Sequence, residues 1–595
     1  MTRLFFRRLS RAVGFVLLLT AFNWTAANWL LWSNVDRIDQ SLEQGRWPIA
    51  QGKISAEIFR QKPDGGDKEG GRVELFLDHN RFRARFDVEK YVFELGGGDA
   101  TFIGNVKKGV QFAGPPTSFP ECRKALREAA LNLPTPSAAQ RLVLSAWEHP
   151  WITGWARHDG RLCWRIILRH GVALVGSDGS LRSLSLNIPA GSWIWALSLQ
   201  CEKLPDDASI FAAPSASARQ VPAGEIDKSV AESLRILQLP FQLVAGEPDR
   251  FSRAGQGWLR IRDGHRLLHL EGTAYEIGYQ HGRLLAPNIR RLLNRIVYGA
   301  GLYYSLEKGQ WFPEDAIKLC ERQSRWINPE YQEEMRGLAE GANMPLADVR
   351  RGNIFPEFFH CSGVAVFGKA TTRGQLVHAR VLDYMTEVGL QDEAVVIATH
   401  RTGALRWVNV GYAGFIGSVT GMNEKQIAIG EIGGGGEGQW GGTPMSFLLR
   451  GALENATTLD EAVDYMRNRQ RTCEYFYVIS DSKIPDAVGI AATPAMFQVT
   501  RAGEDADGLL EAVPDAVLIS HGDYQTLVRR IRENYGRIDA LKLLKIIKRP
   551  VAGHSNLHNA ILEPQDLRIW VANASRNEPA CDQPPVIYEW KDLFR

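Results

Sequence analysis

The chain has 595 residues, of which 45% are hydrophobic and 23% are charged; these are the proportions of a globular protein and exclude wholesale disorder. Because one hydrophobic core does not extend over this length, we expect two globular domains after an N-terminal segment. The formal net charge is only +3 and the basic residues are spread along the chain, which argues against a nucleic-acid-binding protein.

The N-terminal segment, residues 1–35, has the pattern of a membrane-targeting sequence. Four arginines precede an uncharged run from Ala12 to Val35, which is about long enough to span a bilayer and contains tryptophans suited to its interface. We predict a transmembrane helix that acts as a signal-anchor, with a cleaved signal peptide as the alternative. Because the arginines stay on the cytoplasmic side, both place the remaining chain outside the cytoplasm, and the anchor fixes it to the membrane of the cell envelope.

Residues 36–215 are predicted to form an antiparallel β-rich domain. Apolar or alternating stretches of strand length are separated by glycine-containing turns, with two helical patterns between them. The strand patterns lie at 73–77, 81–87, 91–95, 163–169 and 181–187, and the helical patterns at 121–131 and 138–147. With its Ile210-Phe-Ala-Ala-Pro ending, the domain is similar to the half-barrel of lipoprotein-carrier proteins of the LolA type. No motif in this half carries chemistry.

Residues 216–258 are predicted to be a linker, because the stretch 203–228 around its start is rich in Pro, Ala, Ser and Asp. A last domain then covers 259–595. Its helical patterns lie at 274–297, 314–327, 332–341, 444–456, 459–468 and 524–533, and its strand patterns at 363–367, 376–380, 393–399, 427–432, 475–480, 517–520 and 568–572. Because helices and strands occur in separate groups and do not alternate strictly, we predict an α+β fold built from layers.

The seven cysteines are scattered, and no two have the C-x-x-C spacing of a zinc or redox site, which makes a cysteine-based metal centre improbable. Cys361 is the candidate for chemistry. It begins one predicted strand, and Arg380 and Asp383 end the next, so a hairpin would return them to its neighbourhood.

A nearby cation lowers the pKa of a thiol and makes it a nucleophile. Arg380 supplies such a cation, and Asp383 could hold an amine in position for proton transfer. By spacing alone the competing interpretation, a buried structural cysteine beside an ordinary salt bridge, is favoured.

Six motifs occur in a fixed order along about 330 residues. They are Gly272-Thr-Ala-Tyr-Glu-Ile-Gly-Tyr-Gln-His-Gly282, Cys361-Ser-Gly, Arg380-Val-Leu-Asp383-Tyr, Gly421-Met-Asn-Glu-Lys-Gln-Ile-Ala, Gly442-Thr-Pro-Met-Ser-Phe-Leu-Leu-Arg450 with the helix after it, and His558-Asn-Ala-Ile-Leu-Glu-Pro. In this order they resemble the isopenicillin-N (acyl-coenzyme A:6-aminopenicillanate) acyltransferases, a branch of the N-terminal-nucleophile (Ntn) hydrolases. The third motif is also similar to that of choloylglycine hydrolases.

The resemblance implies a four-layer αββα sandwich for 259–595, made as an inactive precursor that cuts itself between His360 and Cys361. The freed α-amine of Cys361 then serves as its own general base, since its ordinary pKa lies near neutral pH. The thiolate attacks the carbonyl of an acyl amide, so the protein is expected to be an autoproteolytic hydrolase or acyltransferase of carbon–nitrogen bonds that needs no cofactor. Arg380 and Asp383 flank the nucleophile, and Asn423 contacts substrate or oxyanion.

One strand departs from the family pattern. Where the family carries Thr-Asn-His, this chain has Ser520 before His521, and the family's Asn commonly helps to bind the oxyanion. Ser520 therefore implies a changed oxyanion arrangement or another substrate class. His521 is either a proton relay or a satisfied half-buried histidine. The departure keeps a second function open, a catalytically degenerate envelope protein that binds lipids or acyl groups through its β-rich domain.

Overall fold

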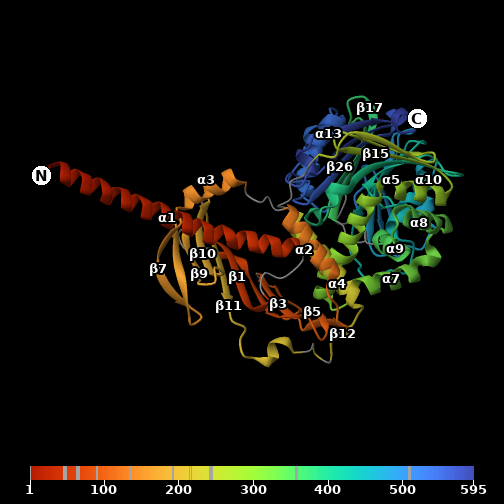
Figure 1. Cartoon of the computed structure of the whole chain (residues 1–595). Coiled ribbons are helices and arrows are strands. Elements are labelled where there is room, and N and C mark those ends of the chain that lie inside the picture. Colours follow the sequence, from red (N-terminus) through yellow and green to blue (C-terminus); the bar gives the residue numbers. More distant parts are fainter. Residues whose placement is uncertain are drawn as a thin grey trace. The chain divides into compact units, whose positions relative to one another are not determined.

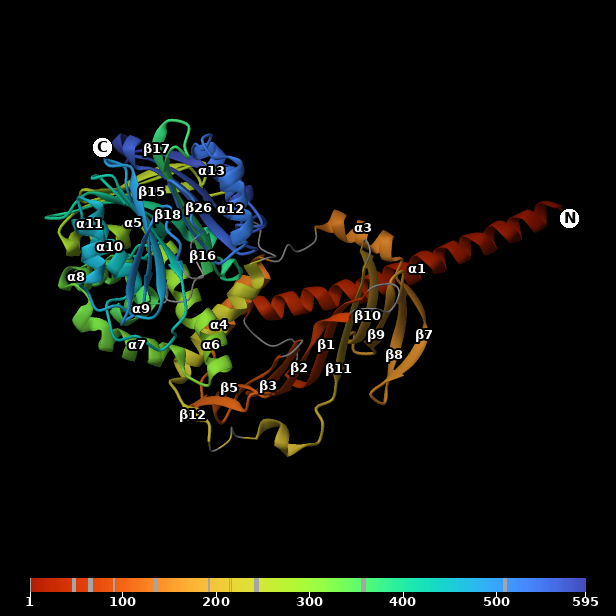
Figure 2. The same ribbon diagram turned by 180° about the vertical axis from the view of Figure 1, so that it is seen from behind.

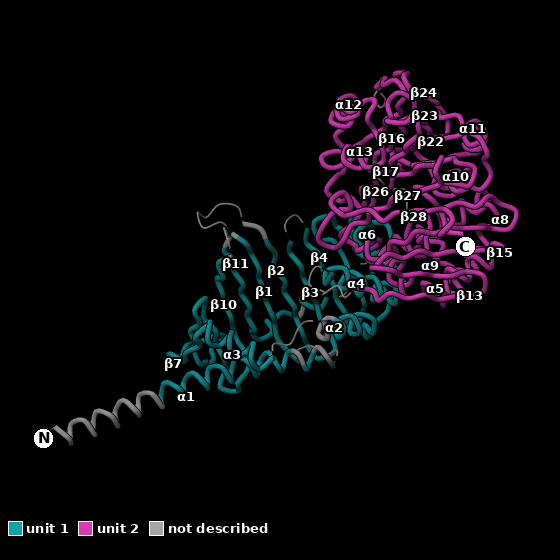
Figure 3. The backbone as a smooth tube through the Cα atoms, turned by 90° about the horizontal axis from the view of Figure 1, so that it is seen from above, with its two compact units in different colours: residues 1–242, 302–311 teal, residues 243–301, 312–595 magenta. Residues whose placement is uncertain are grey.

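The computed structural model describes residues 2–44, 50–61, 68–88, 91–132, 137–190, 193–212, 215, 217–239, 246–354, 360–506 and 511–594. The chain divides into two compact units (Figure 3). Unit 1 comprises residues 1–242 and 302–311, and unit 2 comprises residues 243–301 and 312–595. The stretch predicted as a linker holds helix α4 (Ala223–Gln238) and strand β13 (Arg250–Ala254), so it contains regular structure of both units.

Unit 1 is built on one large sheet, which has twelve strands in the described residues in the order β12-β6-β5-β4-β3-β2-β1-β11-β10-β9-β8-β7. All its neighbouring pairs are antiparallel except β12 with β6. The strands are β1 (Gln51–Gln61), β2 (Lys68–Asp78), β3 (Arg81–Val88), β4 (Tyr91–Gly97), β5 (Thr101–Asn105), β6 (Val110–Gly114), β7 (Trp151–His158), β8 (Arg161–Leu168), β9 (Gly171–Gly176), β10 (Leu181–Ala190), β11 (Trp193–Glu202) and β12 (Arg219–Gln220). Each strand predicted from the sequence of this half overlaps one of them, although the one at 163–169 extends one residue past the end of β8.

One end of this sheet carries the larger core of unit 1. Helices α2 (Pro120–Asn132) and α4 pack there with residues 302–311, which include most of α6 (Gly301–Lys308). The Trp311 side chain is fully buried. Its ring packs at a tilt of 53° against Phe112, with the centroids 5.0 Å apart, and its indole N–H donates to Glu225 at 2.7 Å. Residues far along the chain therefore complete the core of unit 1.

Helix α1 (Thr2–Glu43) covers the run that the sequence predicted to span a membrane (Figure 1). Its polar residues bind the sheet of its own unit: the Asn23 amide exchanges two hydrogen bonds with the backbone of Ile152, at 2.8 and 2.9 Å, and the Asn34 amide bonds Gly179 and Leu181. Of the helices in the described residues, none is long and apolar enough to cross a bilayer. The prediction of a transmembrane signal-anchor is therefore wrong, and the membrane partner and envelope location that depended on it are not retained.

Unit 2 contains two sheets. The ten-stranded sheet has the order β13-β14-β15-β18-β19-β20-β21-β22-β23-β24, and the six-stranded sheet has the order β25-β16-β17-β26-β27-β28, in the described residues. Their bounds are β14 (Gly257–Arg262), β15 (His265–Gly272), β16 (His360–Gly368), β17 (Gly374–Asp383), β18 (Ala394–Arg401), β19 (Trp407–Tyr412), β20 (Thr420–Asn423), β21 (Ile427–Gly433), β22 (Tyr475–Asp481), β23 (Asp486–Ala492), β24 (Phe497–Arg501), β25 (Ala516–Ser520), β26 (Asn556–Glu563), β27 (Arg568–Asn573) and β28 (Val586–Glu589). Among the strand pairs described in these two sheets, β15 with β18 is parallel and the others are antiparallel. The predicted α+β class is confirmed.

Three apolar clusters place the helices of unit 2 against these sheets. Helices α5 (Ala274–Asn294), α8 (Pro329–Ala342), α9 (Leu346–Ile354) and α10 (Met445–Asn455) pack on the ten-stranded sheet, and α12 (Tyr524–Glu533) and α13 (Ala540–Ile546) on the six-stranded one. The third cluster joins side chains of both sheets. Figure 2 shows α12 and α13 on one side of the strands and α8, α10 and α11 (Leu459–Arg467) on the other.

Helices α5 and α8 approach closely because glycines line their contact. A Cβ on Gly278 would lie 2.0 Å from the carbonyl oxygen of Glu334, and one on Gly337 would lie 2.1 Å from that of Tyr275. Thr273 begins α5 with a capping box, in which its side chain and that of Glu276 each bond the other's backbone N–H. The first of the six motifs therefore encodes a helix start and a helix–helix contact.

Candidate active site

Strands β16 and β17 form the predicted hairpin, which is confirmed. Cys361 stands opposite Leu382, and His360 stands opposite Asp383. Strand β25 pairs with the other edge of β16, with Ser520 opposite Ser362. The backbone at residue 361 therefore lies between the end of β17 and the end of β25. The side chains of His360 and Cys361 are outside the part of the chain that the structure describes.

The two faces of this hairpin have different surroundings. Val364 and Val381 belong to the apolar cluster with α12 and α13. Gly363 and Arg380, which are paired across the strands, face the ten-stranded sheet instead: a Cβ on Gly363 would lie 2.7 Å from a methyl carbon of Ile432. The β16 backbone thus packs tightly against the neighbouring sheet on the face that carries Arg380.

Arg380 forms a buried ion pair on that face. Its Nη2 donates to Oε2 of Glu431 in β21 at 3.1 Å, and both residues are fully buried. A charge removed from water is tolerated only when an opposite charge compensates it, so each side chain offsets the cost of burying the other. The pair fixes a cation on the strand next to the one that carries Cys361.

Asp383 ends β17 and is largely buried. Its Oδ1 accepts the backbone N–H of Gly553 at 3.0 Å, and a Cβ on Gly553 would lie 3.1 Å from the carboxyl carbon. Burial raises the pKa of Asp383, against the opposing effects of the Gly553 N–H, the Asn556 side chain and the positive charge of Arg380. A carboxyl group with a raised pKa is suited to exchanging a proton with an amine.

Ser520 and His521 have separate surroundings. The Ser520 hydroxyl bonds the Ser362 hydroxyl at 2.6 Å and accepts the Gly522 N–H at 3.1 Å, on the face of the sheet that α12 and α13 cover. The His521 ring instead contacts Phe476 of β22, with centroids 5.6 Å apart. His521 therefore lies toward the ten-stranded sheet, as Arg380 does, whereas Ser520 bridges two strands on the opposite face.

Asn423, the predicted oxyanion or substrate contact, is fully engaged elsewhere. Its amide nitrogen donates to the carbonyls of Leu453 and Ala456 at 2.9 and 2.8 Å, and its oxygen accepts the N–H groups of Lys425 and Ile427 at 3.0 and 3.1 Å. A side-chain amide has two N–H donors, and both are used. The structure does not bring Asn423 together with the other candidates; it ties the β20–β21 turn to the end of α10.

Three polar residues between the sheets were not predicted as site residues, although one of them, His558, begins the sixth motif. Glu431 pairs with Arg380, His378 bonds Ser480 at 2.8 Å, and His558 bonds Tyr412 and Thr420 at 2.9 and 3.1 Å. Burial, reinforced by the charge of Arg380, lowers the pKa of His378 to about 3 and that of His558 well below its usual range. The signal for Glu431 was available, because a carboxylate within an apolar strand requires a buried partner.

The glycine run after β21 is held by a neighbouring loop. The Gly435 N–H donates to the Glu474 carboxylate at 3.0 Å, and the Gly435 carbonyl accepts the Glu474 N–H at 2.9 Å. A Cβ on Gly434 would lie 2.3 Å from the Glu474 carbonyl oxygen, so the close approach requires glycine there. Across the described residues, no group of three or more His, Cys, Asp or Glu side chains is placed to hold a metal ion.

Comparison with known proteins confirms the resemblance seen in the motifs. A family model described as acyl-coenzyme A:6-aminopenicillanic acid acyl-transferase matches residues 371–500. Protein dcd1B of Dictyostelium discoideum is 23% identical over 346 residues, which are 53% of this chain and 69% of that protein. The N-acylethanolamine-hydrolyzing acid amidase of Caenorhabditis elegans is 25% identical over 190 residues, 28% of this chain and 52% of that protein.

A solved structure of the Caenorhabditis elegans N-acylethanolamine-hydrolyzing acid amidase ortholog also aligns with this chain. It is 18% identical with a TM-score of 0.29, over 34% of this chain and 93% of that one. Because this score is low, the fold described above rests on the strands and helices of the chain itself.

Proposed function

We propose that the chain is an acyl-amide hydrolase or acyltransferase that uses Cys361 as its nucleophile after cutting its own His360–Cys361 bond. The observation that carries the proposal is the register of β16, β17 and β25. In this register Asp383 of β17 stands opposite His360, the residue before Cys361, and His521 directly follows Ser520, the last residue of β25. The buried Arg380–Glu431 pair supplies a fixed cation on the adjacent strand.

Each group has a role in the proposed reaction. Asp383 stands opposite His360, beside the bond to be cut, and its raised pKa suits it to position the α-amine that the cut releases. Arg380 stabilises negative charge on the thiolate and on the tetrahedral intermediate. His521 is a proton relay on the same side of the sheet. Ser520 holds β25 to β16, so the family's oxyanion donor at that position is replaced by another group.

The reaction consists of two acyl transfers, first to the Cys361 sulfur and then to water or an amine. The Cys361 sulfur attacks the carbonyl carbon of the amide while its α-amine takes the thiol proton. The carbon–nitrogen bond then breaks, the leaving amine takes that proton, and an acyl thioester remains on Cys361. Water, or a second amine, attacks the thioester and restores the thiol.

In the self-cut the Cys361 nitrogen is still an amide and cannot act as the base, so the thiol proton passes to water while the sulfur attacks the His360 carbonyl carbon. The carbon–nitrogen bond then breaks, the Cys361 nitrogen takes up a proton and becomes the free α-amine, and water hydrolyses the His360 thioester and restores the thiol.

Two further observations support the proposal. The matched family is described as an acyl-transferase, and one relative is named as an amidase that hydrolyses N-acylethanolamine, which is an acyl amide. The helix positions in unit 2, with α12 and α13 on one sheet and α5, α8 and α10 on the other, fit the four-layer αββα sandwich expected of an Ntn hydrolase.

The test compares wild type with Cys361→Ala and Cys361→Ser on a denaturing gel and with a panel of N-acyl amides. We expect wild type to give fragments of 360 and 235 residues and to hydrolyse an acyl amide. Cys361→Ala should remain one inactive chain. Cys361→Ser tests the nucleophile separately, since a hydroxyl can still attack but is the weaker nucleophile at neutral pH.

Cys201→Ser is the control, because Cys201 is a partly exposed thiol of unit 1 and should affect neither readout. A wild-type chain that stays whole yet hydrolyses acyl amides would overturn the self-cut alone. Activity retained in Cys361→Ala would overturn the nucleophile.

A further inference from the structure

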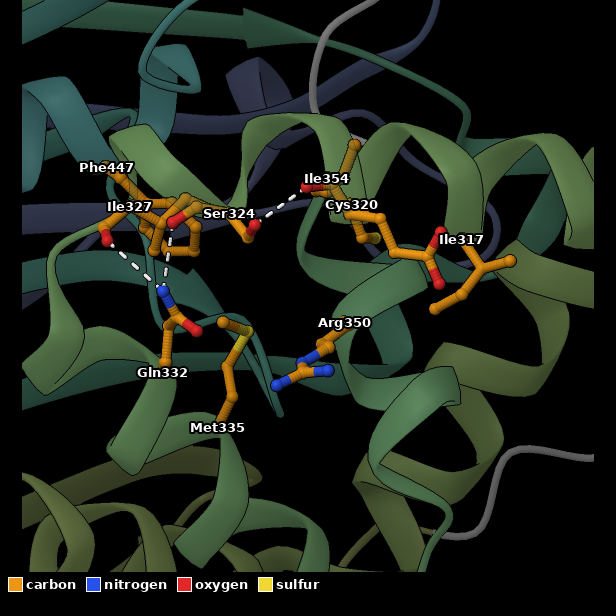
Figure 4. A pocket seen from close by; sticks show the side chains of 10 residues that line it. Ile317, Cys320, Ser324, Ile327, Gln332, Met335, Arg350, Ile354 and Phe447 are labelled. Atoms are coloured by element: carbon orange, nitrogen blue, oxygen red, sulfur yellow. Dashed lines mark hydrogen bonds between the residues drawn. The ribbon is translucent and has the colours of Figure 1, made fainter.

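A cavity of about 270 Å³ lies among four helices of unit 2, α7 (Phe312–Gln323), α8, α9 and α10 (Figure 4). Its lining residues are Ile317, Cys320, Glu321, Ser324, Ile327, Gln332, Met335, Arg350, Ile354 and Phe447. Small-molecule sites are concave, mostly apolar and provided with a few polar groups, and this lining fits that description. It includes none of the residues assigned to the reaction at Cys361.

The apolar part of the wall is rigidly built. Ile327, Met335 and Phe447 are buried members of the cluster that joins the helices to the ten-stranded sheet. The Gln332 amide donates to the carbonyls of Ser324 and Ile327, at 3.0 and 3.3 Å, and so fixes the turn between α7 and α8 (Figure 4). The amide nitrogen and two carbonyls of this wall are therefore already hydrogen-bonded, and Ile327, Met335 and Phe447 supply its hydrocarbon surface.

Arg350 supplies the charge. It is half-buried on α9 and extends its guanidinium into the cavity (Figure 4), where it has no hydrogen bond or ion pair with any described residue. The next residue differs, since Arg351 pairs with Asp348 at 3.0 Å. A guanidinium beside hydrocarbon and without a partner favours an anion that accepts two parallel N–H donors, which is the geometry of a carboxylate.

Two residues of α7 complete the lining. Burial raises the pKa of the Cys320 thiol to about 12, so it is neutral at physiological pH and acts as a small apolar group, not as a second nucleophile. Glu321 is exposed and lines the cavity with the opposite sign to Arg350. Its carboxylate disfavours a bound anion and favours a bound amine. Substituting Glu321 and Arg350 one at a time therefore separates the effects of the two charges on binding.

We propose that this cavity binds a medium-chain carboxylate, with the carboxylate on Arg350 and the chain against Ile317, Ile327, Met335, Ile354 and Phe447. Burial of the chain supplies free energy in proportion to its apolar area, and the guanidinium fixes its orientation. A carboxylate is also what hydrolysis of an acyl amide releases, but the proposal stands on the cavity alone and requires no reaction at Cys361.

The test is calorimetric titration of the full-length wild-type protein with octanoate, octylamine and octanol, which share a chain and differ in head group. Octanoate should bind most tightly. Arg350→Gln should weaken it about tenfold or more, the loss expected for a hydrogen bond to a charged group. Glu321→Gln should leave the affinity unchanged or raise it. Arg322→Gln, at an exposed arginine of α7 outside the lining, is the matched control and should match wild type.

Ile317→Trp fills the cavity from α7 and should abolish binding of all three probes. Variants that do not fold are covered by a wild-type readout: saturating octanoate should raise the urea concentration at the midpoint of unfolding of the wild-type protein, because it binds the folded chain. Octylamine or octanol binding as tightly as octanoate overturns the proposal. Equal affinity in Arg350→Gln, or an unfolding midpoint that octanoate leaves unchanged, overturns it as well.

Discussion

At the scale of single residues, the interior of unit 2 is organised around charges that have partners. Arg380 was predicted as a site residue from its motif, but its partner Glu431 was not, because the two are 51 positions apart and only the packing of two sheets brings them together. Asn423 shows the opposite case. Its motif was recognised, yet its four hydrogen bonds are all structural, and a motif does not distinguish a residue that binds substrate from one that shapes a turn.

Removing one member of the Arg380–Glu431 pair should destabilise unit 2 strongly. Arg380→Met leaves an uncompensated buried carboxylate, which costs about 3–5 kcal/mol of unfolding free energy. The double variant Arg380→Met/Glu431→Met should recover most of this loss, as measured by urea unfolding. The exposed pair Arg529–Glu533, at 3.3 Å, is the matched control, and Arg529→Met should cost less than about 1 kcal/mol. A double variant no more stable than the single one would contradict this account.

A side chain at Gly430 should crowd the buried cation, because this glycine packs against the Arg380 side chain. A Cβ there would lie 3.2 Å from Cδ of Arg380 and 3.2 Å from Nε2 of His378, closer than carbon contacts normally allow. Gly430→Ala should therefore cost about 1–3 kcal/mol and reduce self-cutting and acyl-amide turnover together. Unfolding and gel measurements on one preparation check both effects. Normal stability with normal turnover would show that Arg380 has room to move.

At the scale of helices and strands, local sequence patterns predicted where elements occur, whereas tertiary packing determined which elements contact one another. The helix predicted at 524–533 is α12 with the same bounds, and the strands predicted around Cys361 and Arg380 form the hairpin. Alternation and capping residues act locally, so sequence can reveal them. The contact between α5 and α8 is different: its glycines were recognised as a signature, but that they permit two backbones to touch became visible only in the structure.

The close approach of α5 and α8 gives an element-scale prediction. Gly278→Ala places a methyl group 2.0 Å from a backbone oxygen, which no side-chain rotation relieves, so the helices must separate. We expect a loss of at least about 2 kcal/mol in the free energy of unfolding. Gly224→Ala in α4 is the control, since its Cβ would meet nothing within 4 Å, and it should be neutral or slightly stabilising. Similar losses in both variants would argue against steric contact as the cause.

At the scale of the whole molecule, the sequence predicted two large parts but misjudged the first helix. The uncharged run of α1 has the length of a membrane span, yet Asn23 and Asn34 lie in it because they bond the sheet of unit 1. Length and charge alone do not reveal that a helix has a protein surface as its partner. The same limit applies to residues 302–311, whose membership of unit 1 depends on contacts far apart in the chain.

Acid should destabilise unit 2 through its buried histidines. Burial lowers the pKa of His281 and of His378 from 6.5 to about 3, so the folded protein keeps both neutral while the unfolded chain binds protons below about pH 6.5. A depressed folded-state pKa means that stability is complete above pH 6.5 and is lost as the pH falls toward 3. Each histidine contributes a slope of about 1.4 kcal/mol per pH unit in that window. Urea unfolding at pH 7, 6 and 5 measures the total slope of the unfolding free energy against pH.

His378→Gln should reduce this slope by the share of one histidine, because the amide cannot take up a proton. His79→Gln is the control; the His79 side chain is 72% exposed and belongs to unit 1. An unchanged slope in His378→Gln would place the acid sensitivity elsewhere.

The pairing of β15 with β18 has a consequence for the proposed cut. Strands β13, β14 and β15 precede residue 360 and the rest of the ten-stranded sheet follows it, so the two fragments would share one continuous sheet and one core. Self-cutting would then convert one folded chain into two associated chains that had never been separate in solution. The fragments should co-elute at the size of the whole chain in gel filtration and separate only in denaturant. If the fragments were refolded separately and then mixed, they would have to meet in solution and complete the shared sheet. The intact precursor avoids this step because both parts belong to one chain.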